Sequence, residues 1–224
     1  MIRHYSSVYR FNLYVYCYLM ASISLFFAPK TRLQAQQASV EKKSKIIFLG
    51  DSITAGYGVA KPNAYPALLE TKLKKENLNG FKIINGGISG STSASGLSRL
   101  KWQLKGKPNY IIIALGANDG LRGTQVNETK KNLEEIIILA KKNQLQVLLA
   151  GMMMPPNYGK QYREDFSAIF PALAKKHKVL LMPFLLDGVA GEPKLNQSDG
   201  IHPNEAGHKI IAEKMWPYLK QLLN

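Results

Sequence analysis

Three side chains in this sequence are of the types that together perform acyl transfer: a serine, a histidine and an aspartate. Ser52 follows a run of strand-type residues that stops at Gly50, and Asp199 precedes His202 by three positions. A serine hydroxyl is a weak nucleophile at neutral pH, so it needs a base, a group that orients the base, and donors for the oxyanion. Asp199 and His202 are the candidates for orienting group and base, because an aspartate bound to one ring nitrogen leaves the other free to accept a proton.

Two further loops offer hydrogen-bond donors for such an oxyanion. Gly90 lies in the glycine- and serine-rich residues 85–92, and a glycine lets an oxygen approach its backbone N–H closely because it has no Cβ. Asn118 follows Gly116 and carries an uncharged side-chain amide. Together with the N–H of Ser52, these groups would form an oxyanion hole with three donors.

Taken singly, these residues also have ordinary structural interpretations. Asp51, Ser52 and Asp199 could each cap a helix, and Gly90 could belong to a turn. Asn118 could close an Asx turn, and His202 could be a solvent-exposed side chain. A metal site is not expected, because His177 and His208 lie on predicted helices at spacings that form no cluster with His202. The catalytic hypothesis therefore depends on whether the fold brings the loops together.

The elements that must position these loops alternate between short apolar runs and longer amphipathic ones. The predicted strands span residues 45–49, 81–85, 110–115, 146–152 and 179–182, and the predicted helices span residues 65–75, 96–104, 127–142, 162–176 and 205–223. This order predicts an α/β fold, a three-layer α/β/α sandwich with a five-stranded parallel sheet of flavodoxin-like order. Because ligands bind outside the carboxyl ends of such strands, the four polar loops are expected to converge at one edge of the sheet.

The first 35 residues are predicted to be a signal peptide or an N-terminal membrane anchor. A basic start precedes the apolar residues 11–28, a stretch longer than a usual signal core and near the lower limit of a membrane span. Residues 36–44 are interpreted as a linker and residues 45–224 as a single domain. We therefore expect an exported protein, periplasmic or extracellular, with cleavage after Ala35 or an uncleaved anchor.

Charge and cysteine content exclude several classes of protein. The formal net charge is +15, and the part after Ala35 carries +11. The lysines are scattered over predicted helices without interleaved aromatic residues, so no nucleic-acid partner is expected; the charge serves solubility or attraction to an anionic membrane. Cys17, in the N-terminal apolar stretch, is the single cysteine, which excludes a disulfide framework and a cysteine nucleophile in the domain.

Four blocks of the sequence resemble the SGNH, or GDSL, hydrolase family. They are Gly50-Asp51-Ser52-Ile53, Gly90, Gly116-Ala117-Asn118-Asp119 and Asp199-Gly200-Ile201-His202-Pro203. Residues 116–123, 154–159 and 166–174 further resemble the secreted arylesterase, thioesterase and lysophospholipase branch, and the similarity runs over residues 45–219. Ile53 stands where the family name has leucine and Ala117 where some relatives have glycine, and neither change removes a functional group.

The resemblance implies a serine esterase that hydrolyses carboxylic esters or thioesters through an acyl-enzyme intermediate, with no metal or organic cofactor. It assigns Ser52 as nucleophile, His202 as base and Asp199 as its orienting group, with Ser52, Gly90 and Asn118 forming the oxyanion hole. A small-molecule ester, thioester or lysolipid is the expected substrate, and the protein is expected to be a monomer.

The acyl group of that substrate is expected to contact residues that leave the fourth predicted strand. Met153, Met154, Pro155 and Tyr158 form this candidate substrate pocket, because flexible thioether side chains suit an apolar chain. Two alternatives remain open. One is a carbohydrate or peptidoglycan O-deacetylase with the same site, and the other is a non-catalytic α/β protein that binds phosphate at the Gly50 or Gly90 loop.

Overall fold

A parallel sheet of five strands lies at the centre of the structure, a computed structural model that describes residues 43–224. The strands are β1 (Ser44–Gly50), β2 (Phe81–Asn85), β3 (Tyr110–Ala114), β4 (Gln146–Ala150) and β5 (Leu180–Met182). Their order in the sheet is β2-β1-β3-β4-β5, and every neighbouring pair is parallel. This is the flavodoxin-like order, so the predicted fold class is confirmed. The predicted signal or anchor and nearly all of the predicted linker lie outside the described residues.

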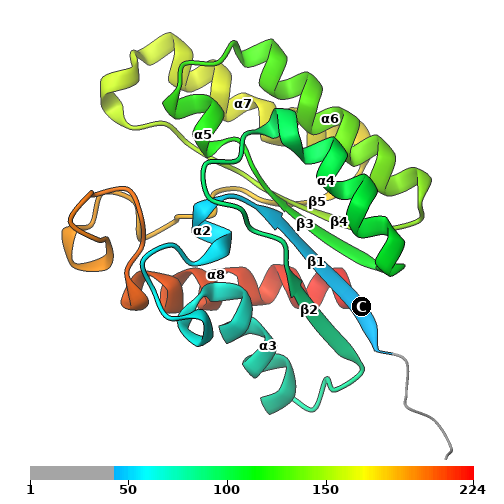
Figure 1. Ribbon diagram of the computed structural model, residues 1–224. Helices are drawn as coiled ribbons and strands as arrows, with labels where there is room; N and C mark the ends of the chain where they lie inside the picture. Colours follow the sequence, from blue (N-terminus) through cyan, green and yellow to red (C-terminus); the bar gives the residue numbers. More distant parts are fainter. Residues whose placement is uncertain (1–42) are drawn as a thin grey trace, which may run out of the picture. The chain divides into compact units, whose positions relative to one another are not determined.

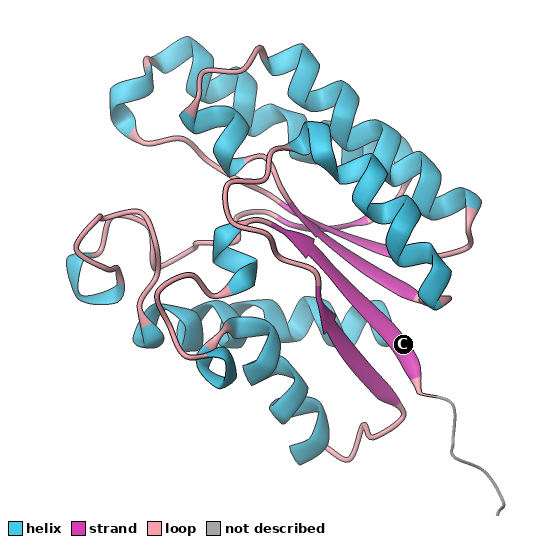
Figure 2. Cartoon of the chain, viewed as in Figure 1, coloured by secondary structure: helices cyan, strands magenta, loops and turns pink. Residues whose placement is uncertain are grey.

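Helices cover both faces of this sheet. They are α2 (Ser52–Ala55), α3 (Tyr65–Lys75), α4 (Gly96–Gln103), α5 (Ala117–Leu121), α6 (Val126–Lys142), α7 (Lys160–His177) and α8 (Glu205–Leu223), with single 3₁₀ turns at Lys61–Asn63, Ser93–Ser95, Leu104–Gly106, Pro156–Tyr158 and Pro193–Leu195. Helices α3 and α8 lie on one face, and α4, α6 and α7 lie on the other (Figures 1 and 2). No helix within residues 43–224 has both the length and the apolar character needed to cross a membrane.

Burial on both faces explains the composition of the central strands. All residues of β1 from Ile46 to Gly50 are buried, as is the run from Ile111 to Ala114 in β3. A strand covered on both sides needs continuous rather than alternating apolar residues. Helix α6 instead buries Leu133, Ile136 and Ile137 at helical spacing against the sheet layer. Full burial of one aliphatic side chain of this size stabilises the fold by about 1.5–3 kcal/mol.

Two short helices differ from the sequence prediction and matter for the site. The predicted strands 110–115 and 146–152 end earlier than expected, and α2 and α5 begin where loops were expected. With four and five residues, these helices are too short to show a helical period in the sequence. As a result, Ser52 is the first residue of α2 and Asn118 is the second residue of α5.

The loop after β2 lies directly against α2. A Cβ at Gly87 would stand 2.2 Å from the backbone nitrogen of Ala55 and 2.6 Å from the carbonyl carbon of Thr54. The next residue, Ile88, donates its N–H to the carbonyl of Gly50 at 3.2 Å. The close backbone approach therefore fixes the loop that carries Gly90 against the helix that carries Ser52.

We predict that Gly87→Ala separates this loop from α2. The added methyl group meets backbone atoms that cannot rotate away, so the free energy of unfolding should fall by about 1–3 kcal/mol, measured by urea denaturation. Gly80→Ala is the matched control, because a Cβ there has no neighbour within 4 Å. Equal stability of Gly87→Ala and Gly80→Ala would contradict this packing account.

A buried histidine connects α8 to α3. His208 has 0% of its surface exposed, and its Nδ1 accepts a hydrogen bond from the backbone N–H of Tyr65 at 3.2 Å. Its Nε2 is buried without a partner among residues 43–224. Burial lowers the pKa of His208 from 6.5 to about 4, because a charged ring would lose its hydration. The folded protein therefore holds a neutral imidazole.

We predict that His208→Asn makes stability less sensitive to acid. The histidine stabilises the fold fully above its unfolded pKa of about 6.5, and this contribution is lost as the pH falls towards the folded value of about 4. The asparagine oxygen keeps the acceptor for Tyr65. Between pH 7.5 and pH 4.5 the wild type should lose about 2–3 kcal/mol more than the variant, measured by urea denaturation at each pH. Parallel pH dependences would show that His208 is not the titrating group.

Candidate active site

The turn between β1 and α2 holds the hydroxyl of Ser52 at the carboxyl edge of the sheet. Asp51 caps α2, because its Oδ1 accepts the N–H of Ile53 at 3.0 Å. A Cβ at Gly50 would lie 1.9 Å from the side-chain oxygen of Thr54, so only glycine fits where the strand turns into the helix. Ser52 is itself buried, with 8% of its surface exposed.

The structure brings Ser52, His202 and Asp199 into one chain of hydrogen bonds. Ser52 Oγ lies 2.9 Å from His202 Nε2, and His202 Nδ1 lies 2.7 Å from Asp199 Oδ2. The other oxygen of Asp199 accepts the backbone N–H groups of His202 and Ile201, each at 3.0 Å. A carboxylate facing Nδ1 fixes the proton on that nitrogen, which leaves the Nε2 lone pair to accept the serine proton.

Hydrogen bonds keep Asp199 in its charged form. The backbone N–H of His202, then its ring, then the N–H of Ile201 lower the pKa of Asp199 from 3.8 to about 2. The carboxylate is therefore ionised throughout the neutral range. It can orient the imidazole and stabilise a positive charge on it without taking its proton.

The predicted oxyanion donors lie on two loops that are joined to each other. Asn118 Nδ2 donates to the carbonyl of Ser91 at 3.0 Å, which leaves its second amide hydrogen for a ligand. Gly90, next to Ser91, has a φ of +75°, a conformation that favours glycine. Among residues 43–224, the backbone N–H groups of Ser52 and Gly90 have no protein acceptor.

Sequence reasoning missed the residues that support these loops. Asp119 is buried and accepts the N–H of Ser93 at 2.8 Å and its hydroxyl at 2.5 Å, so it ties α5 to the loop of Gly90. Arg99 donates from Nη2 to the carbonyls of Gly50, at 2.9 Å, and Gly86. In the sequence, Asp119 is marked only as the last residue of the motif at positions 116–119. Arg99 gives no sequence signal, because its partners are backbone carbonyls.

Asp51 occupies an unusual electrostatic position beneath this site. Burial raises its pKa from 3.8 to about 6, against the opposing hydrogen bond from Ile53. Its Oδ2 is buried without a partner among the described residues, and the charge of Arg99 favours its ionised form. The buried position of Asp51 and its bond to Ile53 agree with a role in shaping the turn between β1 and α2.

The four predicted pocket residues differ in their surroundings. Met154 is buried and contacts the position that a Cβ of Gly120 would occupy, so it packs beneath α5. Met153 is 49% exposed, and Tyr158 donates its hydroxyl to the carbonyl of Leu121 at 2.9 Å. Pro155 is partly exposed. Met153 and Met154 line a hollow with residues of α7. Ser52, His202 and Asp199 do not border this hollow.

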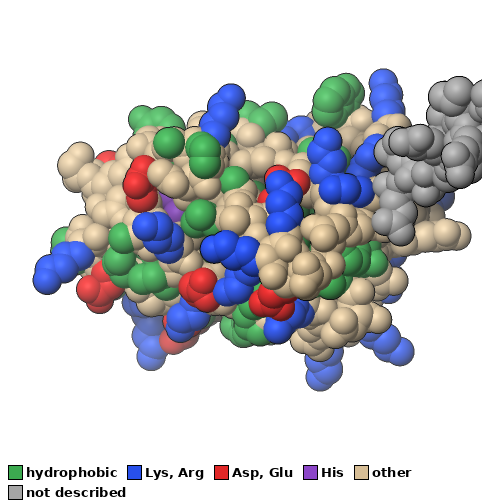
Figure 3. Space-filling model, turned by 90° about the horizontal axis from the view of Figure 1, so that it is seen from below, with side chains coloured by type: hydrophobic (Ala, Val, Ile, Leu, Met, Phe, Trp, Pro, Cys, Tyr) green, Lys and Arg blue, Asp and Glu red, His purple; other side chains and the backbone are tan. Residues whose placement is uncertain are grey.

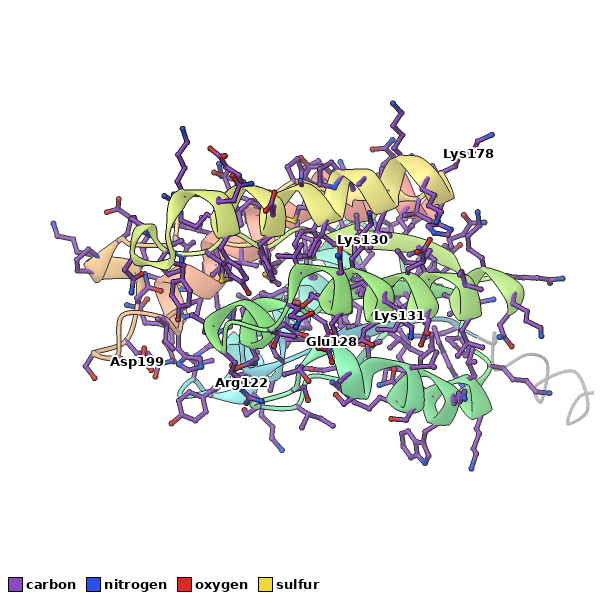
Figure 4. The ribbon with its side chains drawn as sticks, turned by 90° about the horizontal axis from the view of Figure 1, so that it is seen from above. Arg122, Glu128, Lys130, Lys131, Lys178 and Asp199 are labelled. Atoms are coloured by element: carbon purple, nitrogen blue, oxygen red, sulfur yellow. The ribbon has the colours of Figure 1, made fainter. Side chains whose placement is uncertain are left out.

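Exposed apolar side chains instead lie on the loops that carry Ser52, Gly90 and His202. Tyr57, Ile88 and Ile201 are 52%, 54% and 46% exposed, and they lie on the loops of Ser52, Gly90 and His202. The rings of Tyr57 and His202 are 4.6 Å apart. Figure 4 shows Asp199 and Arg122 at the same end of the molecule, opposite Lys178. No cluster of three or more metal-ligating side chains occurs within residues 43–224.

Known proteins are similar to this chain in sequence and in fold. Residues 48–210 match the model of the GDSL-like Lipase/Acylhydrolase family. Esterase TesA of Pseudomonas aeruginosa is 41% identical over 192 residues, which cover 85% of this chain and 94% of TesA. Thioesterase 1/protease 1/lysophospholipase L1 of Escherichia coli (strain K12) is 41% identical over 180 residues, which cover 80% of this chain and 85% of that protein.

A solved structure agrees with these sequence relationships. The psychrotrophic esterase EstA from Pseudoalteromonas sp., inhibited by monoethylphosphonate, superimposes with a TM-score of 0.77 at 33% identity. The match covers 81% of this chain and all of the EstA chain, 100%. This chain belongs to the GDSL-like lipase/acylhydrolase family.

Proposed function

We propose that this chain is a serine esterase that hydrolyses carboxylic esters or thioesters, with Ser52 as the nucleophile. The observation that carries the proposal is the unbroken chain of hydrogen bonds from Asp199 through His202 to Ser52, with distances of 2.7 and 2.9 Å. A base within hydrogen-bond reach of a buried hydroxyl, itself oriented by an ionised carboxylate, is the arrangement that activates serine.

In the first half of the reaction, Ser52 Oγ forms a bond to the substrate carbonyl carbon while its proton moves to His202 Nε2. The carbonyl oxygen gains a negative charge and accepts hydrogen bonds from Ser52 N–H, Gly90 N–H and Asn118 Nδ2. His202 then gives its proton to the departing alcohol or thiol, and an acyl ester of Ser52 remains. Asp199 stabilises the positive imidazolium in both steps.

In the second half, water replaces the alcohol or thiol. His202 takes a proton from the water as its oxygen attacks the acyl carbon, and the same donors hold the new oxyanion. When the tetrahedral species collapses, the proton returns to Ser52 Oγ and the carboxylic acid leaves. The protein's own side chains thus supply every proton transfer that this cycle requires.

An apolar acyl group is the substrate feature that the site favours. Tyr57, Ile88 and Ile201 present exposed apolar side chains on the loops that carry Ser52, Gly90 and His202. Burying such surface against an acyl chain is more favourable in free energy than burying it against the polar ring of a sugar. The names of the relatives, esterase and thioesterase with lysophospholipase, agree with this preference. We therefore propose short to medium acyl esters as the substrates, rather than acetylated carbohydrate or peptidoglycan.

We predict that Ser52→Ala and His202→Ala each lower kcat on p-nitrophenyl esters by roughly 10⁴-fold or more. Removing either group breaks the same proton path, so the double variant should be no worse than the single variants. Thermal unfolding should show that both variants remain folded. Substantial activity in Ser52→Ala would overturn the assignment.

A fluorophosphonate separates serine hydrolase chemistry from phosphate binding. Esterase and O-deacetylase chemistry both predict one label per chain, located on Ser52 by peptide mapping, whereas a phosphate-binding protein would not react. A panel of p-nitrophenyl esters of increasing length, acyl thioesters, lysophospholipids and acetylated glycans then identifies the acyl group. Activity confined to acetylated glycans would favour the deacetylase.

Export, a monomeric state and attraction to anionic membranes complete the proposal. The chain carries a formal net charge of +15, of which +11 belongs to the part after Ala35. Figure 3 shows Lys and Arg side chains spread over the visible face among a few acidic ones. We predict that binding to vesicles containing anionic lipid exceeds binding to neutral vesicles. The excess should vanish at about 0.5 M salt, where the Debye length falls to a few ångströms. Equal sedimentation with both vesicle types would exclude the charge effect.

A further inference from the structure

One amide side chain bridges the segments of the nucleophile and the base. Gln197 lies two residues before Asp199, in the connection between β5 and α8. Its Nε2 donates to the carbonyl of Tyr57 at 2.7 Å and to the carbonyl of Pro203 at 3.0 Å. Both amide hydrogens are thereby used, and two carbonyl partners fix which end of the amide is nitrogen.

The two carbonyls held by Gln197 are each connected to a reacting residue. On one side, the backbone N–H of Tyr57 donates to the carbonyl of Ser52 at 3.0 Å. On the other side, Pro203 follows His202, and the backbone N–H of Gln197 donates to the carbonyl of His202 at 2.7 Å. Hydrogen bonds therefore connect the backbones of Ser52 and His202 independently of the bond between their side chains.

The neighbouring residues fit around this amide. A Cβ at Gly58 would stand 2.0 Å from Gln197 Oε1, and Gly58 has a φ of +75°. Position 58 therefore leaves space that the amide fills. The Tyr57 ring, whose backbone carbonyl the amide holds, lies 4.6 Å from the His202 ring and covers one side of it.

We propose that Gln197 is a positioning residue that sets the distance between Ser52 Oγ and His202 Nε2. The inference rests on the proposed esterase function. The two side chains come from residues 150 positions apart, and proton transfer between them requires a separation near the observed 2.9 Å. Displacement by about 1 Å can cost roughly 100-fold in rate. Gln197 prevents this displacement by joining the two segments through the carbonyls of Tyr57 and Pro203.

A neighbouring amide provides the matched control. Asn196 Nδ2 donates to the carbonyls of Val189 and Glu192, at 2.7 and 2.9 Å, and both partners belong to the same connection between β5 and α8. Asn196 therefore stabilises this connection internally, whereas Gln197 joins it to the segment of Ser52. If the amides only stabilised the loop, loss of either would have the same consequences.

The test compares Gln197→Met with Asn196→Leu, each close in size and without amide donors. Gln197→Met should lower kcat roughly 10- to 100-fold with KM nearly unchanged, and should slow fluorophosphonate labelling of Ser52 by a similar factor. The low-field proton resonance of the hydrogen bond between Asp199 and His202 should persist, because that pair lies within one turn. Asn196→Leu should lower the melting temperature but keep kcat within a few-fold.

Gln197→Asn provides a second variant that retains an amide. Its side chain is one methylene too short to hold both Tyr57 and Pro203, so kcat should fall as in Gln197→Met. A Gln197→Met enzyme with kcat within twofold of wild type would overturn the inference, as would equal loss of kcat in Asn196→Leu. Wild-type protein that fails to label at Ser52 would overturn the proposed function and this inference together. A labelled wild type with unaffected Gln197 variants overturns the inference alone.

Discussion

The hydrogen bond between Ser52 Oγ and His202 Nε2 joins residues 150 positions apart, and the rest of the site has meaning only if it forms. A single such bond contributes about 1 kcal/mol, far less than the entropy cost of ordering two distant loops. Its geometry must therefore come from elsewhere. The parallel sheet supplies it, because the carboxyl end of the interior strand β1 and the long connection after β5 reach the same edge.

Close backbone contacts extend this order from the sheet to Ser52 and His202. A Cβ at Gly50 has no room beside Thr54, so the turn into α2 is tight. A Cβ at Gly87 has no room beside the backbone of α2, so the loop after β2 lies closer to this helix than most residues would allow. Buried polar groups complete the arrangement. Arg99 holds two backbone carbonyls, while Asp51 remains partly unpaired in a buried position that raises its pKa. Unfavourable burial of polar groups at the site is thus offset by the apolar packing of the sheet.

The sequence predicted some parts of this structure better than others. Helices α3 and α8 and strand β2 have the predicted bounds, because long amphipathic periods and short apolar runs are local signals. The rule that strand ends converge predicted that the loops of Ser52, Asp199 and His202 meet, and the resemblance to the GDSL family supplied the roles expected of these residues. Arg99 and Gln197 could not be found in this way, because each binds backbone carbonyls whose proximity exists only in the fold. Burial of Met154 likewise depends on the neighbouring α5, a helix too short to predict.

A crystal structure of the protein after reaction with a phosphonate ester tests the central claim most directly. The adduct imitates the tetrahedral intermediate, so its geometry reports where the oxyanion is stabilised. The account predicts a covalent bond from phosphorus to Ser52 Oγ, with one phosphonyl oxygen accepting hydrogen bonds from Ser52 N–H, Gly90 N–H and Asn118 Nδ2. A phosphonyl oxygen directed to solvent, or an adduct on another residue, would contradict it.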